Sequence, residues 1–498
     1  MTFQEITDGI IALFSRQPRE PLLFNSGSFW ILFIAFIIVY AFICNRKTRM
    51  MLYVATFSLF FFYLSNGFIF LLLVSTAIYD FLIAQQIHKC QNKKHRKAYL
   101  ILSISLSVGI LAYFKYTNFF IKTWNALFAG DFSFLNIFLP IGISFYTFQT
   151  IAYVVDVYRG KIEPANSLLQ YLFYISFFPL ILAGPIMRAD KFFPQIQDKK
   201  IITKTMIYGG LWLIILGITK KAIFADYIAQ FNNWVFEDPL HYSGFEGLMA
   251  LIGYSAQIYC DFSGYSDISI GLASIMGFNL GINFNFPYQA RNLSDFWRRW
   301  HISLSTWMRD YIYIPLGGNR PSASLSNRAN QLRLYMNNLI TMLIAGLWHG
   351  ASWMFVIWGA MHGIGLIIHK LNKPWLDKLP KNILVTFMSW LLTFSFVTFL
   401  WIFFRGSDMT VCINLITHIA TDFDIAYAVP FFYARKTWCI LLILIFALHS
   451  IRPAFYEKMK DWFIRSPWIV KIIVFLVVIQ MVLQFSTGEV QPFIYFQF

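Results

Sequence analysis

The stretch that decides the fold begins RNLSDFWRRWHISLSTWMRDYIYIPLGGNR at residues 291–320 and resumes as MNNLITMLIAGLWHGASWMFVIWGAMHG at residues 336–363. Seven charged residues fall in the first block, although the chain is 58% hydrophobic. The second block places His349 in an otherwise apolar run. Ionisable groups are expensive at membrane depth and by default mark a working site, so we predict that this stretch holds an active site.

The composition indicates a membrane protein. The mean hydropathy is +0.58, while 19% of the 498 residues are aromatic and only 13% are charged. A membrane helix needs about 20 mostly apolar residues, and runs of this kind recur along the whole chain. We therefore predict an all-α polytopic integral membrane protein with about 10 to 13 membrane helices.

The net charge of +16 is explained by membrane topology rather than by nucleic-acid binding. Basic residues collect in loops at residues 45–49 and 88–97, and cytoplasmic loops carry an excess of Lys and Arg. Nucleic-acid binding would need a folded basic surface. The five cysteines are scattered, with no CxxC or HExxH motif, so we expect neither a disulfide framework nor a metal site.

Three segments divide the chain. Residues 1–22 lack the basic start and the small-residue cleavage site of a signal peptide, and we expect an interfacial amphipathic segment there. Residues 23–404 are predicted to form the membrane core that contains the site. Residues 405–498 are predicted to supply further membrane segments.

Two of the apolar runs are interrupted. Residues 51–84 are long enough for two short helices with a turn near Gly67. In residues 168–188, Pro179 and a later Gly-Pro pair break the helix. Irregular backbone at membrane depth is tolerated only where protein or a wet cavity covers it, so we expect a re-entrant segment beside the site.

The block YCDFSGYSD contains two acidic residues, Asp261 and Asp267. Six positions correspond to about 240° around a helix, so the two carboxylates are not expected to share a face. We interpret them as structural hydrogen-bonding groups rather than as a catalytic pair.

Residues 292–310 are predicted to form one amphipathic helix. In such a helix Asp295 can pair with Arg298 or Arg299 one turn further on. The arginines here, together with Arg309, suit either lipid head groups or an anionic substrate, and the sequence leaves both interpretations open.

His301 and Ser305 are four positions apart and would share one face of that helix. A Ser–His nucleophile pair is one interpretation, but the spacing is common and no G-x-S-x-G motif surrounds Ser305. The loop that follows contains Gly317 and Gly318, whose backbone can approach a ligand closely. A plain cytoplasmic loop explains this composition equally well.

His349 has the surroundings expected of a general base, with Trp348, Trp353 and Trp358 predicted to wall it. A neutral imidazole can take a proton from a hydroxyl group near pH 7. A lone histidine on an apolar helix is more often an interhelical hydrogen-bonding group, and this alternative stays open. His362 lies about 220° further round a helix, so we do not expect it to share the face of His349.

Taken together, these blocks resemble the membrane-bound O-acyltransferase family, in particular its bacterial alginate O-acetyltransferase-like branch. The resemblance extends from around residue 23 onward, without residues 410–436. It rests on SFYTFQTIAYVVDVYRG (144–160), LAGPIMR (182–188), YCDFSGYSDISIGLASIMGF (259–278), the two blocks quoted at the outset, and the terminal QPFIYFQF.

The resemblance implies a helical core with a central tunnel that reaches the catalytic histidine of the LWHG block, here His349. A second polar residue of the family falls on His301. No metal and no permanently bound cofactor are implied, and the acyl donor is expected to be acetyl-CoA or another acyl thioester. Further substrate-binding residues are expected at Trp348, Ser305, Arg298, Arg299, Arg309, Asp310, Asn319 and Trp353.

The expected function is transfer of an acetyl or other acyl group across a bacterial inner membrane to hydroxyls of an exported polysaccharide. The expected partner is an extracytoplasmic acetyltransferase of the SGNH-hydrolase type. Two alternatives remain at this point. One is D-alanyl transfer to teichoic acid or to another acyl acceptor, and the other is a polysaccharide or lipid transporter whose histidines relay protons.

Overall fold

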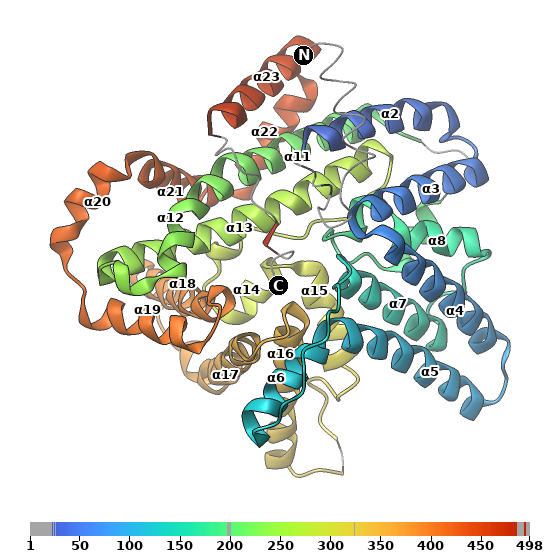
Figure 1. The fold of residues 1–498 in the computed structure, drawn as a ribbon, viewed down its shortest axis with the longest axis horizontal. Coiled ribbons are helices and arrows are strands. Elements are labelled where there is room, and N and C mark those ends of the chain that lie inside the picture. The colour runs from blue at the N-terminus through green and yellow to red at the C-terminus, as the bar shows by residue number, and fades with distance from the viewer. Residues whose placement is uncertain are drawn as a thin grey trace. The chain divides into compact units, whose positions relative to one another are not determined.

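The computed structural model describes residues 22, 24, 26–196, 201–322, 324–485 and 493–494. All regular elements in these residues are helices (Figure 1), which confirms the all-α prediction. The predicted interfacial segment at residues 1–22 lies, apart from Leu22, outside the described residues. The chain divides into two compact units, one comprising Met1–Ile214 with Tyr265–Gly281 and the other Ile215–Gly264 with Ile282–Phe498.

The helices of the first unit precede those of the second along most of the chain. The first unit contains α2 (Gly27–Ile43), α3 (Lys47–Asn66), α4 (Phe70–Lys89), α5 (Lys93–Leu111), α6 (Thr117–Phe128), α7 (Ile143–Tyr158), α8 (Leu168–Ser176), α9 (Phe178–Ile181) and α10 (Ala189–Phe192). Helices α11 (Lys204–Ile218) and α13 (Gly244–Ile275) contribute to both units. The second unit contains α12 (Asp226–Glu237), α14 (Leu293–Arg299), α15 (Ile302–Met308), α16 (Asn327–His349), α17 (Trp353–Leu376), α18 (Ile383–Arg405), α19 (Met409–Thr421), α20 (Ala428–Ala434), α21 (Lys436–His449), α22 (Pro453–Arg465) and α23 (Trp468–Phe485).

Six helical stretches of the described chain are long and apolar enough to cross a membrane, or seven if one bent pair of helices is a single span. They are Lys47–Lys89, Lys93–Phe128, Lys204–Glu237, Trp353–Leu376, Ile383–Arg405 and Trp468–Phe485, and the bent pair is Ile425–Ala434 with Lys436–His449. The apolar helices α2 and α19 are shorter than these spans. The prediction of about 10 to 13 membrane helices is larger than six or seven because it also included short and more polar segments of this kind.

Side-chain hydrogen bonds compensate for the broken helices of the first unit. Helix α3 ends at Asn66, and Gly67 has a φ of 59°, as the predicted interruption requires. The run around Pro179 is likewise divided between the short helices α8 and α9. The backbone N–H of Phe178 donates to Ser58 Oγ at 3.1 Å, and the Ser269 hydroxyl donates to the Pro179 carbonyl. The backbone groups that these breaks release are therefore paired inside the protein, as an apolar surrounding demands.

A buried ion cluster joins helices of the second unit. Lys221 Nζ lies 2.7 Å from Asp226 Oδ1 and 2.6 Å from Asp261 Oδ1. The second carboxylate oxygen of Asp261 accepts the backbone N–H of Ile494 at 3.0 Å. Asp261 therefore has the structural role predicted for it, although its cationic partner was not foreseen.

Helices α16 and α17 cross with their backbones in contact. A Cβ atom built on Gly346 would lie 2.2 Å from the Phe355 carbonyl oxygen, which is closer than side chains allow, and 3.2 Å from the Cα of Gly359. Small residues permit this kind of approach between membrane helices. The crossing occurs one turn before His349, so the position of His349 is set by contact between main chains.

The prediction of one continuous helix over residues 292–310 is wrong at Trp300, which is extended, and at His301. His301 adopts a left-handed conformation with a φ of 41° and separates α14 from α15. The backbone N–H of Ile302 donates to the Asn283 carbonyl at 2.9 Å, and the N–H of Ser303 donates to the Asn283 side chain at 3.1 Å. A residue distant in sequence thus caps α15, and the new start turns His301 out of the helical register.

Candidate active site

The structure places the two predicted catalytic histidines on either side of one tryptophan. The ring centroid of Trp348 lies 6.0 Å from that of His301 and 5.1 Å from that of His349. His301 is completely buried and His349 is 3% exposed. The second unit therefore brings together a residue just before α15 and the last residue of α16.

Asn283 determines how the ring of His301 is presented. Its Oδ1 accepts hydrogen bonds from Ser303 N at 3.1 Å and from Ser303 Oγ at 2.9 Å, and it lies 3.3 Å from His301 Nδ1. Since that oxygen is an acceptor, Nδ1 is the protonated nitrogen and Nε2 carries the lone pair. Burial lowers the pKa of His301 to about 3, so the imidazole is neutral near pH 7.

His349 is enclosed by aromatic rings. The centroids of Trp348, Trp358 and Phe404 each lie 5.1 Å from the His349 centroid. Trp353, which was predicted to complete this wall, is 53% exposed and is not part of the buried wall. A close aromatic surround excludes water from the ring, which is the condition under which a thioester is protected from hydrolysis.

A third histidine, His362, lies behind this wall. Its ring centroid is 4.7 Å from that of Trp358 and 5.0 Å from that of Trp297. It is completely buried, and neither ring nitrogen has a hydrogen-bond partner among the described residues. The expectation that His362 does not share the helix face of His349 assumed one helix, whereas His349 ends α16, His362 belongs to α17, and Trp358 contacts both rings.

A cavity of about 240 Å³ lies within the second unit, and neither His301 nor His349 is among its lining residues. It lies against α15, which starts immediately after His301, and against α16, which ends at His349. Its lining consists of Ser294, Trp297, Leu304, Ser305, Met308, Arg309, Tyr313, Asn319, Asn338, Thr341, Met342, Ala345, Leu366 and Lys370. Ala345, which lines the cavity, precedes His349 by one turn of α16, so this part of the cavity is one helical turn from His349.

Three of the predicted substrate-binding residues line this cavity, namely Ser305, Arg309 and Asn319. Ser305 does not form the Ser–His pair considered from spacing, because its hydroxyl donates to the Trp300 carbonyl at 3.1 Å. The Asn319 side chain accepts a hydrogen bond from the Tyr313 hydroxyl at 2.6 Å.

The remaining predicted residues are placed differently. Asp310 holds Arg309 in a bidentate pair, with distances of 2.7 and 3.3 Å, and its hydrogen bond raises the pKa of Arg309 further. Asp295 pairs with both Arg298, at 3.4 Å, and Arg299, at 3.0 Å, as predicted. The Arg298 side chain is 72% exposed, and neither of these two arginines lines the cavity.

Sequence reasoning missed Lys370, which is the second cation of the cavity. Its ammonium donates to Tyr313 Oη at 3.3 Å and to Asn338 Oδ1 at 3.2 Å, and it forms no ion pair with any described residue. A lysine inside an apolar helix was the available signal. No group of three His, Cys, Asp or Glu side chains in the described chain is arranged to hold a metal ion.

A family model described as MBOAT, membrane-bound O-acyltransferase family, matches residues 164–416, a range that contains both candidate histidines and the whole cavity lining. The chain belongs to the membrane-bound O-acyltransferase family. It is therefore a multi-pass membrane protein and an acyltransferase.

Relatives with named activities agree with this assignment. The "Peptidoglycan O-acetyltransferase" of Helicobacter pylori is 34% identical over 457 residues, which cover 81% of this chain and 84% of the relative. The "Probable alginate O-acetylase AlgI" of Pseudomonas putida is 30% identical over 506 residues, covering 96% and 100% of the two chains. The "Teichoic acid D-alanyltransferase" of Bacillus subtilis is 29% identical over 281 residues, covering 54% and 70%.

Proposed function

We propose that this chain transfers an acetyl group, or a closely related acyl group, from a cytosolic thioester to a hydroxyl of an exported polysaccharide. The observation that carries the proposal is the pair of buried imidazoles, His301 and His349, together with a cavity that has a cationic lining and includes Ala345, one turn of α16 before His349. Relatives named for acetylation of peptidoglycan and of alginate support this acceptor class.

The cavity has the charge expected of a donor-binding site. Acyl-CoA and other pantetheine thioesters carry phosphate groups and a narrow neutral arm. Arg309 is neutralised by Asp310, whereas Lys370 is held only by neutral oxygens. Lys370 is therefore the cation available to a phosphate, and the side chains of Ser305 and Asn338 can hydrogen-bond the amides of the arm.

His349 acts as the general base in the proposed transfer. Its imidazole accepts the proton of the acceptor hydroxyl while the hydroxyl oxygen attacks the thioester carbonyl carbon. A C–O bond forms, the C–S bond breaks, and the imidazolium returns the proton to the departing thiolate. General-base catalysis by a positioned histidine contributes about 10²- to 10⁴-fold to such a rate.

His301 acts as a positioning residue for the base in this scheme. Its Nδ1 faces the Asn283 oxygen, so the neutral ring carries its lone pair on Nε2. The neutral state of His301 matters, because a second charged imidazole would disfavour protonation of His349. Trp348, which contacts both rings, keeps the two imidazoles apart while excluding water.

An inner-membrane location and an extracytoplasmic partner of the SGNH-hydrolase type complete the proposal. The donor is made in the cytosol and the polymer is modified outside, so the acyl group must cross the membrane that contains this protein. D-alanyl transfer is the second candidate, because a teichoic acid D-alanyltransferase is among the relatives.

The test measures O-acetyl and D-alanyl content of exported polymers in cells that carry the wild type, the His349→Ala variant or no copy of the protein. The proposal expects acetylation to be lost equally in the variant and the deletion, with the variant present at normal level. Loss of D-alanyl esters alone would favour the second candidate. Unchanged acylation of every polymer would refute the role of His349.

A further inference from the structure

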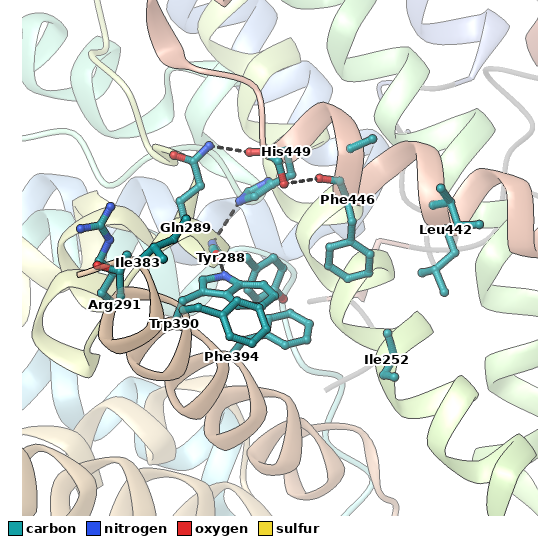
Figure 2. A pocket seen from close by; sticks show the side chains of 15 residues that line it. Ile252, Tyr288, Gln289, Arg291, Ile383, Trp390, Phe394, Leu442, Phe446 and His449 are labelled. Carbon is teal, nitrogen blue, oxygen red and sulfur yellow. Dashed lines mark hydrogen bonds between the residues drawn. The ribbon is translucent and has the colours of Figure 1, made fainter. Parts of the chain in front are cut away.

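A second and larger cavity of the second unit, of about 870 Å³, is unrelated to the histidine pair (Figure 2). Its walls come from α18, α21, residue 252 of α13 and the segment around Tyr288. The lining consists of Ile252, Tyr288, Gln289, Arg291, Ile383, Thr386, Phe387, Trp390, Phe394, Leu442, Ile443, Phe446, Ala447, His449 and Ser450. None of these residues lines the cavity assigned to the acyl donor.

The apolar walls are two helix faces that open toward the surface. Residues 383, 386, 387, 390 and 394 follow the spacing of one face of α18, over about 16 Å of helix. Ile383 is 88% exposed, Phe387 51% and Ile443 65%. Because α18 is long and apolar enough to span a membrane, we expect Phe387, within this helix, to face the hydrocarbon of the bilayer.

The floor of this groove is held by hydrogen bonds, although His449 Nδ1 has no hydrogen-bond partner among the described residues. Trp390 Nε1 donates to the Tyr288 carbonyl at 2.7 Å, and the Tyr288 N–H donates to His449 Nε2 at 3.1 Å. The Gln289 amide donates to the carbonyls of His449, at 2.6 Å, and Ile451, at 3.1 Å. The groove is thus preformed, and these groups do not require a polar ligand.

Arg291 is the only arginine or lysine among the residues that line the groove. It lines the groove, its side chain is exposed, and it forms no ion pair or hydrogen bond with any described residue. Figure 2 shows Arg291 and Gln289 near Ile383, the first residue of α18, whereas Leu442 and Ile252 lie at the opposite end. Within the described residues, Arg291 is therefore an unpaired cation that lies near the first residue of α18 and adjoins the apolar groove.

We propose that this groove binds an anionic phospholipid, with the phosphate on Arg291 and an acyl chain along Trp390, Phe394 and Phe446. The charge of Arg291 and the apolar shape of the groove both indicate an anionic phospholipid. A lipid without net charge would leave the charge of the arginine uncompensated, because the ammonium of its headgroup offsets its phosphate, and a soluble anion would leave the groove exposed. Arginine pairs with phosphate in a bidentate manner, and attraction of an anionic lipid to one cation corresponds to about fivefold in affinity.

Native mass spectrometry of the purified full chain in detergent tests this proposal. Phosphatidylglycerol and phosphatidylcholine with identical acyl chains are titrated against the wild type, Arg291→Gln, Ala447→Trp and Arg465→Gln. Arg465 is an exposed arginine at the end of α22 outside the groove and provides the matched control for loss of charge. Thr386→Trp replaces Ala447→Trp if the latter is not monodisperse.

We expect the wild type and Arg465→Gln to retain phosphatidylglycerol in preference to phosphatidylcholine. Arg291→Gln should weaken phosphatidylglycerol retention about fivefold and leave phosphatidylcholine unchanged, while the tryptophan variant should weaken both. Equal retention by Arg291→Gln and Arg465→Gln would overturn the assignment of the headgroup. A dimer that Ala447→Trp dissociates would show instead that a second copy of the chain occupies the groove.

Discussion

The side chain of Asn283 meets His301 across eighteen positions of sequence, with Oδ1 3.3 Å from Nδ1. The same oxygen accepts two hydrogen bonds from Ser303, so its role as acceptor is fixed. Asn283 thereby caps α15, holds His301 in a left-handed conformation and selects the tautomer of the His301 ring.

Replacing Asn283 should alter the pH dependence of acyl transfer as well as its rate. Asn283→Leu removes the acceptor, and we expect kcat to fall about 10- to 100-fold. Asn283→Asp keeps an acceptor but adds a negative charge, which favours the imidazolium form and raises the pKa of His301. The acidic limb of the rate profile should then move to higher pH in the aspartate variant only. Identical profiles in the two variants would reduce Asn283 to a capping residue.

Removing the proposed base should stop the reaction without unfolding the protein. We expect His349→Ala and His349→Gln to lower the rate about 10²- to 10⁴-fold, measured as label transferred from an acyl thioester by purified protein. His241→Ala is the matched control, since the His241 side chain is 80% exposed. Normal elution in size-exclusion chromatography excludes misfolding, and a fully active His349→Gln variant would contradict the base assignment.

Protonation of His301 should destabilise the protein in acid. Its pKa is about 3 in the folded state, against an ordinary value of 6.5, so the unfolded state binds more protons between these values. The contribution of His301 to stability is therefore complete above about pH 6.5 and is lost as the pH falls toward 3. We expect the melting temperature in detergent to fall less steeply below pH 6 in His301→Gln than in the wild type. Parallel curves would show that His301 does not titrate in this way.

Loss of Lys370 should weaken donor binding and spare the chemical step. For Lys370→Ala we expect KM for an anionic thioester to rise about fivefold to tenfold with kcat nearly unchanged, because a charge-assisted hydrogen bond is lost. Lys373→Ala serves as the control, since that lysine is 59% exposed and pairs with Asp377. A fall in kcat alone would place Lys370 near the reacting atoms instead of the donor phosphate.

Breaking the buried ion cluster should cost far more stability than breaking a surface pair. Lys221→Met leaves Asp226 and Asp261 buried together without their cation, and removal of one partner from such a cluster costs about 3 to 5 kcal/mol. Thermal unfolding should show this loss of stability as a lower melting temperature. The triple change Lys221→Met, Asp226→Asn and Asp261→Asn should recover part of it, and no recovery would point to lost packing.

Local patterns predicted what depends on neighbours in sequence. The interruption at Gly67 and the pairing of Asp295 with Arg298 and Arg299 both follow from propensities within a few positions. The family resemblance then drew attention to His301 and to several residues that line the donor cavity.

Contacts between distant segments could not be read in this way. Residues 292–310 favour an unbroken helix locally, and only the cap from Asn283 divides it. The partner of Asp261 is Lys221, forty positions earlier, and Lys370 faces the cavity because α17 crosses α16 at glycine residues. Each of these features depends on contacts between segments that are distant in sequence. The local sequence alone is compatible with a different structure.

The crossing of α16 and α17 at glycine residues makes the position of His349 independent of the side chains that line the cavity. Because Gly346 and Gly359 fix the helices through their main chains, the base at His349 keeps its place whatever side chains surround the cavity. Met342 and Ala345 project into that cavity from the same helix and can be exchanged without moving the crossing. Under the proposed mechanism, exchange of Met342 or Ala345 would therefore change the size of the acyl group accepted without moving His349.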